Sequence, residues 1–251
     1  VQVDGKWVDP DSVEEAGIEF TSIGLRGWQS YPLHCEDLNR PHILEVVCPP
    51  NTQQSVGISI LEPDASGTLH PVHRDFGFFK DSTRWTETDG QLIQQIVFWP
   101  RTQSPVLLLT NHHPSKPAIF KEIVVKQVLG NIGDLNNQFS PSESSGRDVL
   151  AMLEKPLFPE LFGVTGTLDE ISRAVLDDWH TFYVGGNRLA DYLEYAGYNG
   201  ATVAVVCEGS TLYPTSHIES TPKYESGQLM SNGQDPVRKD VAELLFKVFD
   251  S

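Results

Sequence analysis

The sequence predicts a mixed fold: a jelly-roll-like β-sandwich, followed by an α/β segment that resembles the first part of a (β/α)8 barrel. Repeated short β-prone runs separated by turns fill the first half, which shows no amphipathic helix of three turns. Helical spacing and a nearly all-apolar run characterise the second half. The pattern changes at Val128, so we expect a β-sandwich domain over 1-128, a linker over 129-147 and an α/β segment over 148-251, an incomplete barrel.

The strands of the first half are predicted from alternation and from β-branched or aromatic residues. Val56, Ile58 and Ile60 alternate with smaller or more polar neighbours, as on a half-buried strand. Asn, Asp, Pro and Gly clusters divide the runs, as expected for turns. The other predicted strands are 42–48, 92–99, 106–110 and 120–128.

The second half is predicted to alternate helices and strands. After a Gly-, Asn- and Ser-rich stretch, Leu189, Tyr192, Leu193 and Ala196 follow helical spacing, and Gly197 stands where a helix ends. The apolar run 201–207 predicts a buried parallel strand.

A last helix is predicted from residue 235 onward, with Asp235 as N-cap and Pro236 in the first turn. An earlier strand is expected near 161–165, with 180–184 as the competing position. Two parallel strands do not make a covered sheet, so we expect this half to be the opening of a larger α/β domain, with the rest in the remainder of a larger polypeptide.

Composition narrows the function classes. The 251 residues carry 18 basic and 34 acidic side chains, a net charge of −16 that is spread over both halves. Such a chain repels phosphate backbones, and no apolar run is long enough to span a bilayer, so we expect neither nucleic-acid nor membrane binding. Neither a GxSxG, Walker, GxGxxG nor HExxH motif occurs.

The three cysteines fit neither a disulfide framework nor a CxxC metal site. We expect Cys35, Cys48 and Cys207 to be free structural residues, although Cys35 and Cys48 are able to pair. The redox compartment stays open, with an extracytoplasmic location favoured over a cytoplasmic one.

The loop after the run 201–207 is the richest candidate for chemistry. Ligands of α/β sheets and barrels meet the loops at the carboxyl ends of strands, where Glu208 and Tyr213 are expected. A carboxylate and an aromatic ring suit a sugar. The alternative is that Glu208 caps a turn and Tyr213 packs beneath the loop.

Asp178 and Trp179, which follow Asp177, form a second candidate sugar subsite. Aspartates at this kind of position commonly cap the helix that follows, and this structural interpretation is favoured. Hydrolysis of a glycosidic bond needs two carboxyls facing one bond, and no pair in the sequence can be assigned that geometry.

The histidines predict no metal site. His70 and His73 differ by three positions, so an extended chain points them to opposite faces, and His112 with His113 meets the same objection. No metal and no other cofactor is therefore expected.

Several phrases resemble a known family. They are Asp178-Trp179-His180-Thr181-Phe182-Tyr183, the stretch from Leu189 to Gly200, Glu208-Gly209-Ser210-Thr211-Leu212-Tyr213-Pro214 and, in the first half, Phe98-Trp99-Pro100-Arg101-Thr102. Together they resemble large bacterial glycosyl-hydrolase-like proteins related to family ten.

The resemblance implies a β-sandwich followed by the first strands of a glycosidase-like barrel, whose catalytic carboxylates lie on later strands that this chain does not contain. Glu208 stands where that family usually carries Asp. The resemblance thus implies a carbohydrate-active, glycoside-hydrolase-like protein, with a sugar-site contribution from Glu208 and Tyr213.

Two other functions remain open at this point. The sandwich is a candidate non-catalytic carbohydrate-binding module, which holds polysaccharide through exposed aromatics such as Trp28, Tyr31 or Trp85. It is also a candidate architectural domain that only docks on its own barrel.

Overall fold

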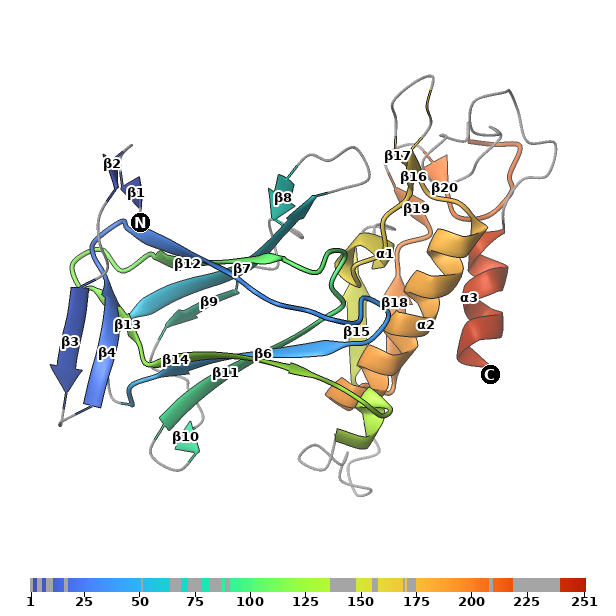
Figure 1. Ribbon diagram of the computed structural model, residues 1–251. Coiled ribbons are helices and arrows are strands. Elements are labelled where there is room, and N and C mark those ends of the chain that lie inside the picture. The colour runs from blue at the N-terminus through green and yellow to red at the C-terminus, as the bar shows by residue number, and fades with distance from the viewer. Residues whose placement is uncertain are drawn as a thin grey trace. The chain divides into compact units, whose positions relative to one another are not determined.

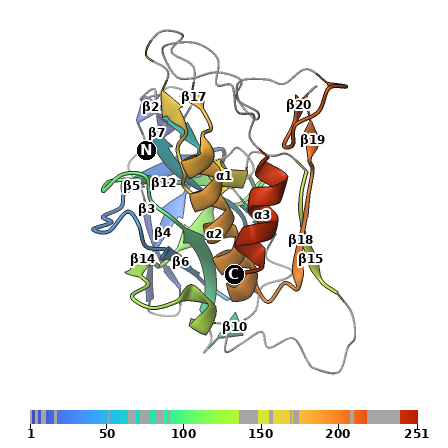
Figure 2. The same ribbon diagram turned by 90° about the vertical axis from the view of Figure 1, so that its right-hand side faces the viewer.

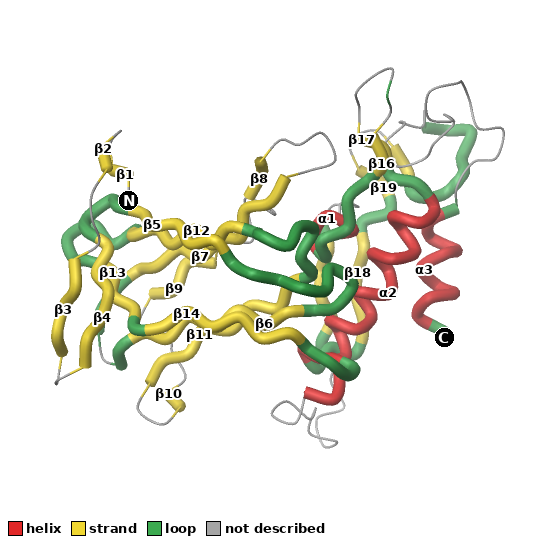
Figure 3. Tube along the Cα trace, in the orientation of Figure 1, coloured by secondary structure: helices red, strands yellow, loops and turns green. Residues whose placement is uncertain are grey.

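The computed structural model divides the chain into two compact units. Unit 1 includes residues 1–63 and 69–128, and unit 2 includes residues 129–251. The structure describes residues 2–3, 6–7, 11–15, 18–50, 52–63, 69–71, 78–81, 87–88, 91–135, 148–154, 158–168, 170, 175–207, 210–218 and 240–251. Figure 3 shows that the described helices all lie in unit 2. The chain is therefore mixed and strand-rich, with several sheets and few helices, as the sequence predicts.

Unit 1 is built from antiparallel sheets (Figure 1). The strands are β1 (Gln2–Val3), β2 (Lys6–Trp7), β3 (Asp11–Glu15), β4 (Ile18–Ile23), β5 (Trp28–Pro32), β6 (His42–Cys48), β7 (Ser55–Pro63), β8 (Leu69–Pro71), β9 (Phe78–Asp81), β10 (Glu87–Thr88), β11 (Gln91–Phe98), β12 (Val106–Asn111), β13 (Ala118–Phe120) and β14 (Glu122–Gln127). One sheet has the order β10-β11-β6-β14 and another the order β5-β12-β7-β8, with β9 also paired to β7. Smaller sheets join β13-β4-β3 and β1-β2.

One hydrophobic core fills the space between the two larger sheets. It takes Leu44 and Val46 from β6 and Ile58, Leu107 and Leu109 from β7 and β12, all at most 1% exposed. Because alternate residues of a strand face one side, β7 buries Val56, Ile58 and Ile60 as its alternation predicts. The apolar alternation that predicts this strand from the sequence therefore also supplies part of the core.

The predicted strands of this unit are found with small changes at their ends. Strand 42–48 has the predicted bounds, and β7, β11 and β12 lie within two residues of theirs. The run 120–128 is not one strand: a bend at Lys121 separates β13, which pairs with β4, from β14, which pairs with β6. The free, buried state of Cys35 and Cys48 is confirmed, and burial raises the pKa of these thiols to about 11 and about 12.

A buried carboxyl holds the loop that leads from β11 into β12. Glu62 is fully buried, and its Oε1 accepts hydrogen bonds from the backbone nitrogens of Arg101 (2.8 Å) and Thr102 (3.0 Å). Its Oε2 is buried without a hydrogen-bond partner in the described part of the chain. Burial raises the pKa of Glu62, and the hydrogen bonds from Thr102 and Arg101 lower it only in part.

Unit 2 contains a strand–helix–strand arrangement. Its elements are a 3-10 helix (Ile132–Leu135), β15 (Leu150–Leu153), α1 (Phe158–Leu161), β16 (Thr167–Leu168), β17 (Val175–Leu176), α2 (Trp179–Ala196), β18 (Gly200–Val203), β19 (Val206–Cys207), β20 (Ser210–Thr211) and α3 (Val241–Phe249). β15 and β18 pair in parallel, with Leu150 opposite Gly200, whereas β16-β17 and β19-β20 are antiparallel. The 3-10 helix, within the predicted linker, packs on α2 and buries Ile132.

Two predictions about these strands are wrong. The partner of β18 is β15 and neither 161–165 nor 180–184, because Leu161 ends α1 and 180–184 lies inside α2. The run 201–207 is not one buried strand either, since the chain leaves β18 after Val203 and returns as β19 in another pair. Leu150 is 52%, Met152 72% and Val206 47% exposed, so apolar content here does not signal burial.

Helix α2 begins and ends with well-formed caps. Asp178 is its N-cap: Oδ1 accepts from the backbone nitrogen of Thr181 at 2.8 Å, and the Thr181 hydroxyl completes a capping box. Gly197 ends the helix at φ 71°, a left-handed conformation that glycine adopts without strain. The predicted glycine stop is confirmed, as are the buried positions of Leu189 and Leu193.

Two adjacent glycines in the middle of α2 let neighbouring helices approach. A Cβ at Gly185 would lie 2.9 Å from Cα of Pro159 in α1, and one at Gly186 would lie 3.1 Å from Cδ2 of Leu245 in α3. Figure 2 shows α2 and α3 side by side. Close packing therefore offsets the low helix propensity of glycine at these positions.

Helix α3 starts later than the sequence predicts. Asp240 is its N-cap, with φ −101° and ψ 86°, and its Oδ1 accepts from the backbone nitrogen of Glu243 at 2.8 Å. The N-cap of α3 is thus Asp240 and not the predicted Asp235; Asp235 and Pro236 themselves lie outside the described residues. Leu212 O also accepts from the backbone nitrogens of Val241 and Ala242, the first amides of the helix. No helix in the described part of the chain has the length and apolar content to cross a membrane.

Alanine substitution is expected to change the stability of the protein differently at the two glycines of α2. G185A forces a Cβ against backbone atoms of α1, and overpacking of this kind costs about 1–3 kcal/mol. G186A meets only the tip of a flexible leucine and gains up to about 1 kcal/mol of helix propensity. Chemical denaturation should therefore rank G186A above G185A; the reverse order would contradict the packing described for α1.

Substitution of Glu62 is expected to change how stability depends on pH. Because the folded-state pKa of this carboxyl is raised, the folded state binds the proton more tightly, and stability falls as pH rises through that pKa. E62Q removes the ionised form and keeps the acceptor for Arg101 and Thr102, so its unfolding free energy at neutral pH should equal or exceed that of the wild type. The difference should vanish at acid pH.

The control for this experiment is E62A, which leaves the two backbone donors without an acceptor and should unfold more easily than E62Q at every pH. Thermal unfolding between pH 4 and 8 measures all three proteins. Equal pH profiles for wild type and E62Q would show that the carboxyl does not carry the raised pKa.

Candidate functional site

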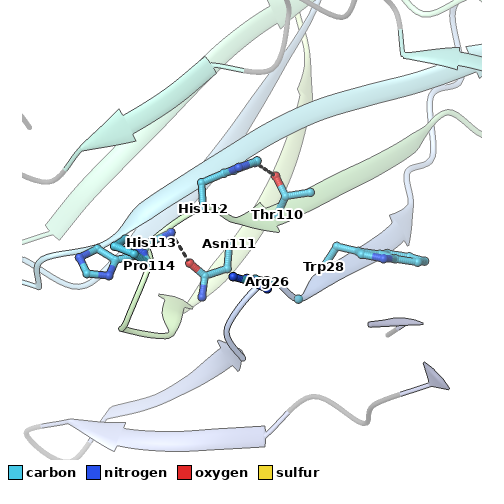
Figure 4. Close-up of a pocket in the computed structure, with 8 residues that line it drawn as sticks. Arg26, Trp28, Thr110, Asn111, His112, His113 and Pro114 are labelled. Atoms are coloured by element: carbon cyan, nitrogen blue, oxygen red, sulfur yellow. Dashed lines mark hydrogen bonds between the residues drawn. The ribbon is translucent and has the colours of Figure 1, made fainter. Parts of the chain in front are cut away.

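A pocket in unit 1 brings together an aromatic ring, a guanidinium group and two imidazoles. It has a volume of about 440 Å3. Figure 4 shows that its residues come from two stretches, the turn before β5 and the end of β12 with the loop beyond it. The described residues that line it are Arg26, Gly27, Trp28, Thr110, Asn111, His112, His113 and Pro114.

The buried amide of Asn111 holds these two stretches together. Its Nδ2 donates to the carbonyl oxygens of Ile23 (3.1 Å), Gly24 (3.0 Å) and Lys116 (2.9 Å). An amide nitrogen has two hydrogens, so three acceptors share them. Oδ1 accepts from the backbone nitrogen of His113 at 2.9 Å, and the backbone nitrogen of Asn111 donates to Gly27 O at 2.9 Å. One 4% exposed side chain therefore fixes both walls of the pocket.

The ring of His113 has a defined tautomer. Its Nδ1 accepts from the backbone nitrogens of Ser115 at 3.2 Å and Lys116 at 3.0 Å. Since Nδ1 is an acceptor, the ring hydrogen sits on Nε2, which is a hydrogen-bond donor.

His112 is oriented by the strand that precedes it. Its Nε2 lies 2.7 Å from Oγ1 of Thr110, whose hydroxyl also donates to Gly57 O at 3.4 Å. With the Thr110 hydrogen used in this way, His112 donates from Nε2 to Oγ1 of Thr110. Burial lowers the pKa of His112, which favours the neutral ring.

The turn before β5 presents Arg26 and Trp28. Arg26 has φ 56°, in the left-handed region, within a turn closed by a hydrogen bond from Gly27 N to Gly24 O at 3.0 Å. Its side chain is exposed, whereas Trp28 is half-buried on the first residue of β5. The half-buried indole offers an apolar ring surface, and the exposed guanidinium offers several donors beside it.

The predicted site residues of unit 2 have structural partners. Asp178 caps α2 and its Oδ2 accepts from the Thr167 hydroxyl at 3.0 Å. Burial raises the pKa of Asp178, but the hydrogen bonds from Thr181 and Thr167 outweigh it and hold the pKa below its usual value. Trp179, the first residue of α2, is 40% exposed.

Tyr213 follows the short hairpin that β19 and β20 form in the same unit. It is half-buried, its carbonyl accepts from the Thr211 hydroxyl at 2.6 Å, and it follows Leu212, whose carbonyl caps α3. The described hydrogen bonds of Asp178 and Tyr213 do not join these two residues. Glu208 lies outside the described residues, so its predicted role at this loop stays a prediction.

The remaining candidates fall into two groups. Tyr31 packs its ring edge on Phe120, with centroids 5.9 Å apart, and its hydroxyl donates to Gln29, so it contributes to the core. Trp85 and His73 lie outside the described residues, and of His70 only the backbone in β8 is described. Among the residues that the structure describes, no three histidine, cysteine or acidic side chains are grouped as metal ligands.

The sequence analysis names one of the pocket residues, Trp28, and misses the residues around it. His112 and His113 were expected on opposite faces, yet both line the pocket because the chain leaves the extended conformation after Asn111. Arg26 and Asn111 carry no motif. The signal that points to Asn111 is a polar residue at the end of the apolar run 106–110, a position that needs buried partners.

Comparisons with known proteins add one distant similarity. Neither a family model nor a curated protein matches the chain. Among solved structures, the chain is similar to a family GH115 4-O-methyl-α-glucuronidase with specificity for decorated arabinogalactans, a glycoside hydrolase. The TM-score is 0.31 at 9% identity, over 48% of this chain and 16% of that chain. This chain thus spans about a sixth of the length of that protein, and a similarity this distant assigns neither fold nor function. The resemblance to family-ten-related proteins stays a prediction.

Substitution of Asn111 is expected to destabilise unit 1. N111D turns a buried donor into an acceptor that faces three carbonyl oxygens, and an uncompensated buried charge costs about 3–5 kcal/mol. N111A leaves the same carbonyls unpaired and should cost about 1–3 kcal/mol. Chemical denaturation measures both; N39D, the same change at an exposed residue, is the control and should stay close to wild type. An N111D protein as stable as N39D would contradict the network.

Proposed function

We propose that unit 1 binds carbohydrate in the pocket formed by Arg26, Trp28, Asn111 and the two histidines, as a non-catalytic binding module of a carbohydrate-active, glycoside-hydrolase-like protein. The single observation that carries this proposal is one pocket that is lined by a half-buried tryptophan and by several hydrogen-bonding side chains. A sugar ring has an apolar face and a rim of hydroxyls, and it needs both kinds of contact.

Two side chains of the pocket, Asn111 and His113, are held in place before any ligand arrives. Asn111 fixes the two stretches of chain, and the His113 ring is oriented by two backbone amides. Groups that are already ordered lose little conformational entropy on binding, which favours affinity for a small polar ligand.

The same pocket supports binding without hydrolysis. Glycosidases that follow the common mechanism place two carboxyl groups around the bond that they break. None of the eight described lining residues carries a carboxyl group. The proposal therefore assigns any hydrolysis to carboxylates outside this pocket.

A second carbohydrate site is proposed at Glu208, Tyr213, Asp178 and Trp179, in the segment that resembles a glycosidase-like barrel. The observation in its favour is the 40% exposed indole of Trp179 at the start of α2. The carboxylate of Asp178 is already used by Thr181 and Thr167, which weakens its availability for a sugar.

Tryptophan substitutions are expected to distinguish the two sites. If the unit 1 pocket binds sugar, W28A should lower the affinity of the full chain for its saccharide at least about tenfold, the equivalent of about 1.4 kcal/mol. Affinity electrophoresis against plant and microbial polysaccharides identifies the ligand, and titration calorimetry with wild type and W28A measures the change.

The control is F246A, which removes a 70% exposed aromatic side chain from α3 and should bind like wild type. W179A tests the second site in the same experiment. Loss of affinity in W179A with full affinity in W28A would place the sugar in unit 2, and no binding to any polysaccharide would end the proposal for the pocket.

A further inference from the structure

We propose that the pocket of unit 1 selects saccharides that carry a carboxylate, and that Arg26 binds this carboxylate. The inference rests on the proposed function, because it names the class of sugar for the same pocket. Uronic acid residues, which carry a carboxylate on the ring, are the members of this class that the proposal tests.

The first observation is the charge of the pocket. The chain has a net charge of −16, with 34 acidic and 18 basic side chains. Yet the described residues of the pocket include one guanidinium, two imidazoles and no acidic side chain. The Arg26 guanidinium is thus a positive charge with no acidic side chain among the described lining residues, and such a charge on an acidic protein attracts an anionic ligand to that place.

The second observation is that the Arg26 guanidinium has no partner within the described part of the chain. Arg26 is exposed, and no hydrogen bond or ion pair of its side chain occurs in the described part of the chain. Arg40, by contrast, pairs with Asp37 at 3.2 Å. Five N–H donors in a fixed plane therefore remain available for an external acceptor.

The third observation is the backbone of Arg26. A side chain at φ 56° is uncommon outside glycine, asparagine and aspartate, and it is held in place by the Gly24 turn and by the bond from Asn111 to Gly27. A glycine would occupy this position without strain. Retention of a long cationic side chain where glycine fits better is the kind of strain found at ligand-binding positions.

These features fit one binding mode. The ring of the saccharide stacks on the indole of Trp28, and its carboxylate accepts two parallel hydrogen bonds from the Arg26 guanidinium. The Nε2–H of His113 is a further donor on the pocket lining, toward a hydroxyl or the carboxylate. A planar guanidinium matches the two oxygens of a carboxylate in a fork, and this favours saccharides that carry a carboxylate over neutral ones.

The test compares matched acidic and neutral ligands on the full chain. Oligogalacturonides, alginate oligosaccharides and glucuronoxylan fragments are titrated in their acid form, which is the ionised carboxylate at neutral pH, and as methyl esters, in which the charge is removed and one methyl group per carboxyl is added. Wild type should bind at least one acid form about tenfold or more tightly than its ester, and the preference should shrink as salt increases.

Four variants connect this preference to Arg26. R26Q should bind acid and ester equally while it keeps the stacking contribution of Trp28, and R26K should keep part of the preference. R26G relieves the left-handed backbone, so it should unfold at the same or a higher temperature than wild type and still lose the preference. K121Q removes one positive charge from an exposed residue outside the pocket and should keep the wild-type preference.

The outcomes separate the inference from the proposed function. Wild type that binds neutral saccharides at Trp28 as tightly as acidic ones, or R26Q that keeps the full preference, would overturn the inference and leave the proposed function standing. Tighter binding of sulfated carrageenan fragments than of every uronic acid would also overturn it. Absence of binding to all saccharides would overturn both.

Discussion

The pocket of unit 1 depends on one buried amide, that of Asn111. Its hydrogen bonds reach the end of β4, the turn before β5 and the loop before β13, segments that lie up to 88 residues away along the chain. Sheet hydrogen bonds place β12 between β5 and β7, but they do not fix the loops beyond the strand ends. Asn111 supplies that constraint, because a buried amide is stable only where its donors and acceptor are paired.

The residues that hold the pocket in shape are therefore different from the residue that is proposed to contact the ligand. The residues that hold the pocket are buried or bonded to backbone, whereas Arg26 is exposed and carries backbone strain. Strain of this kind persists only where the surrounding structure enforces it, and here Gly24, Gly27 and Asn111 do so. A hydrogen-bonded pocket with a strained Arg26 whose side chain makes no described hydrogen bond is more typical of a binding site than of a purely architectural surface.

Much of the fold was predictable because it follows from local patterns. The apolar run 42–48 and the alternation at 56–60 define core strands, and Gly197 ends α2 because a left-handed residue is needed there. The predictions failed where tertiary partners decide. The sequence analysis misses β15 because the run 150–153 is short. It also places the N-cap of the last helix at Asp235, whereas α3 has Asp240 as its N-cap, and both residues are of a type that caps helices.

The candidate site was less predictable for the same physical reason. Trp28 is noticeable by type, but its partners on β12 and beyond are joined to it only by long-range hydrogen bonds, which no spacing rule reports. Conversely, Asp178 is by residue type both a candidate sugar ligand and a helix cap, and the structure shows that its carboxylate caps α2, the interpretation that the sequence analysis favours. Residue type therefore indicates candidate ligand-binding side chains, and only the fold shows which of them lie in one pocket.

The most direct measurement is an NMR titration of the 15N-labelled full chain with its best saccharide ligand. The indole N–H signals of Trp28 and Trp179 are assigned through W28F and W179F. The account predicts that the Trp28 indole and the His113 amide shift in proportion to bound ligand, while the Trp179 indole stays in place. A saturable shift of Trp179 without any change at Trp28 would contradict it.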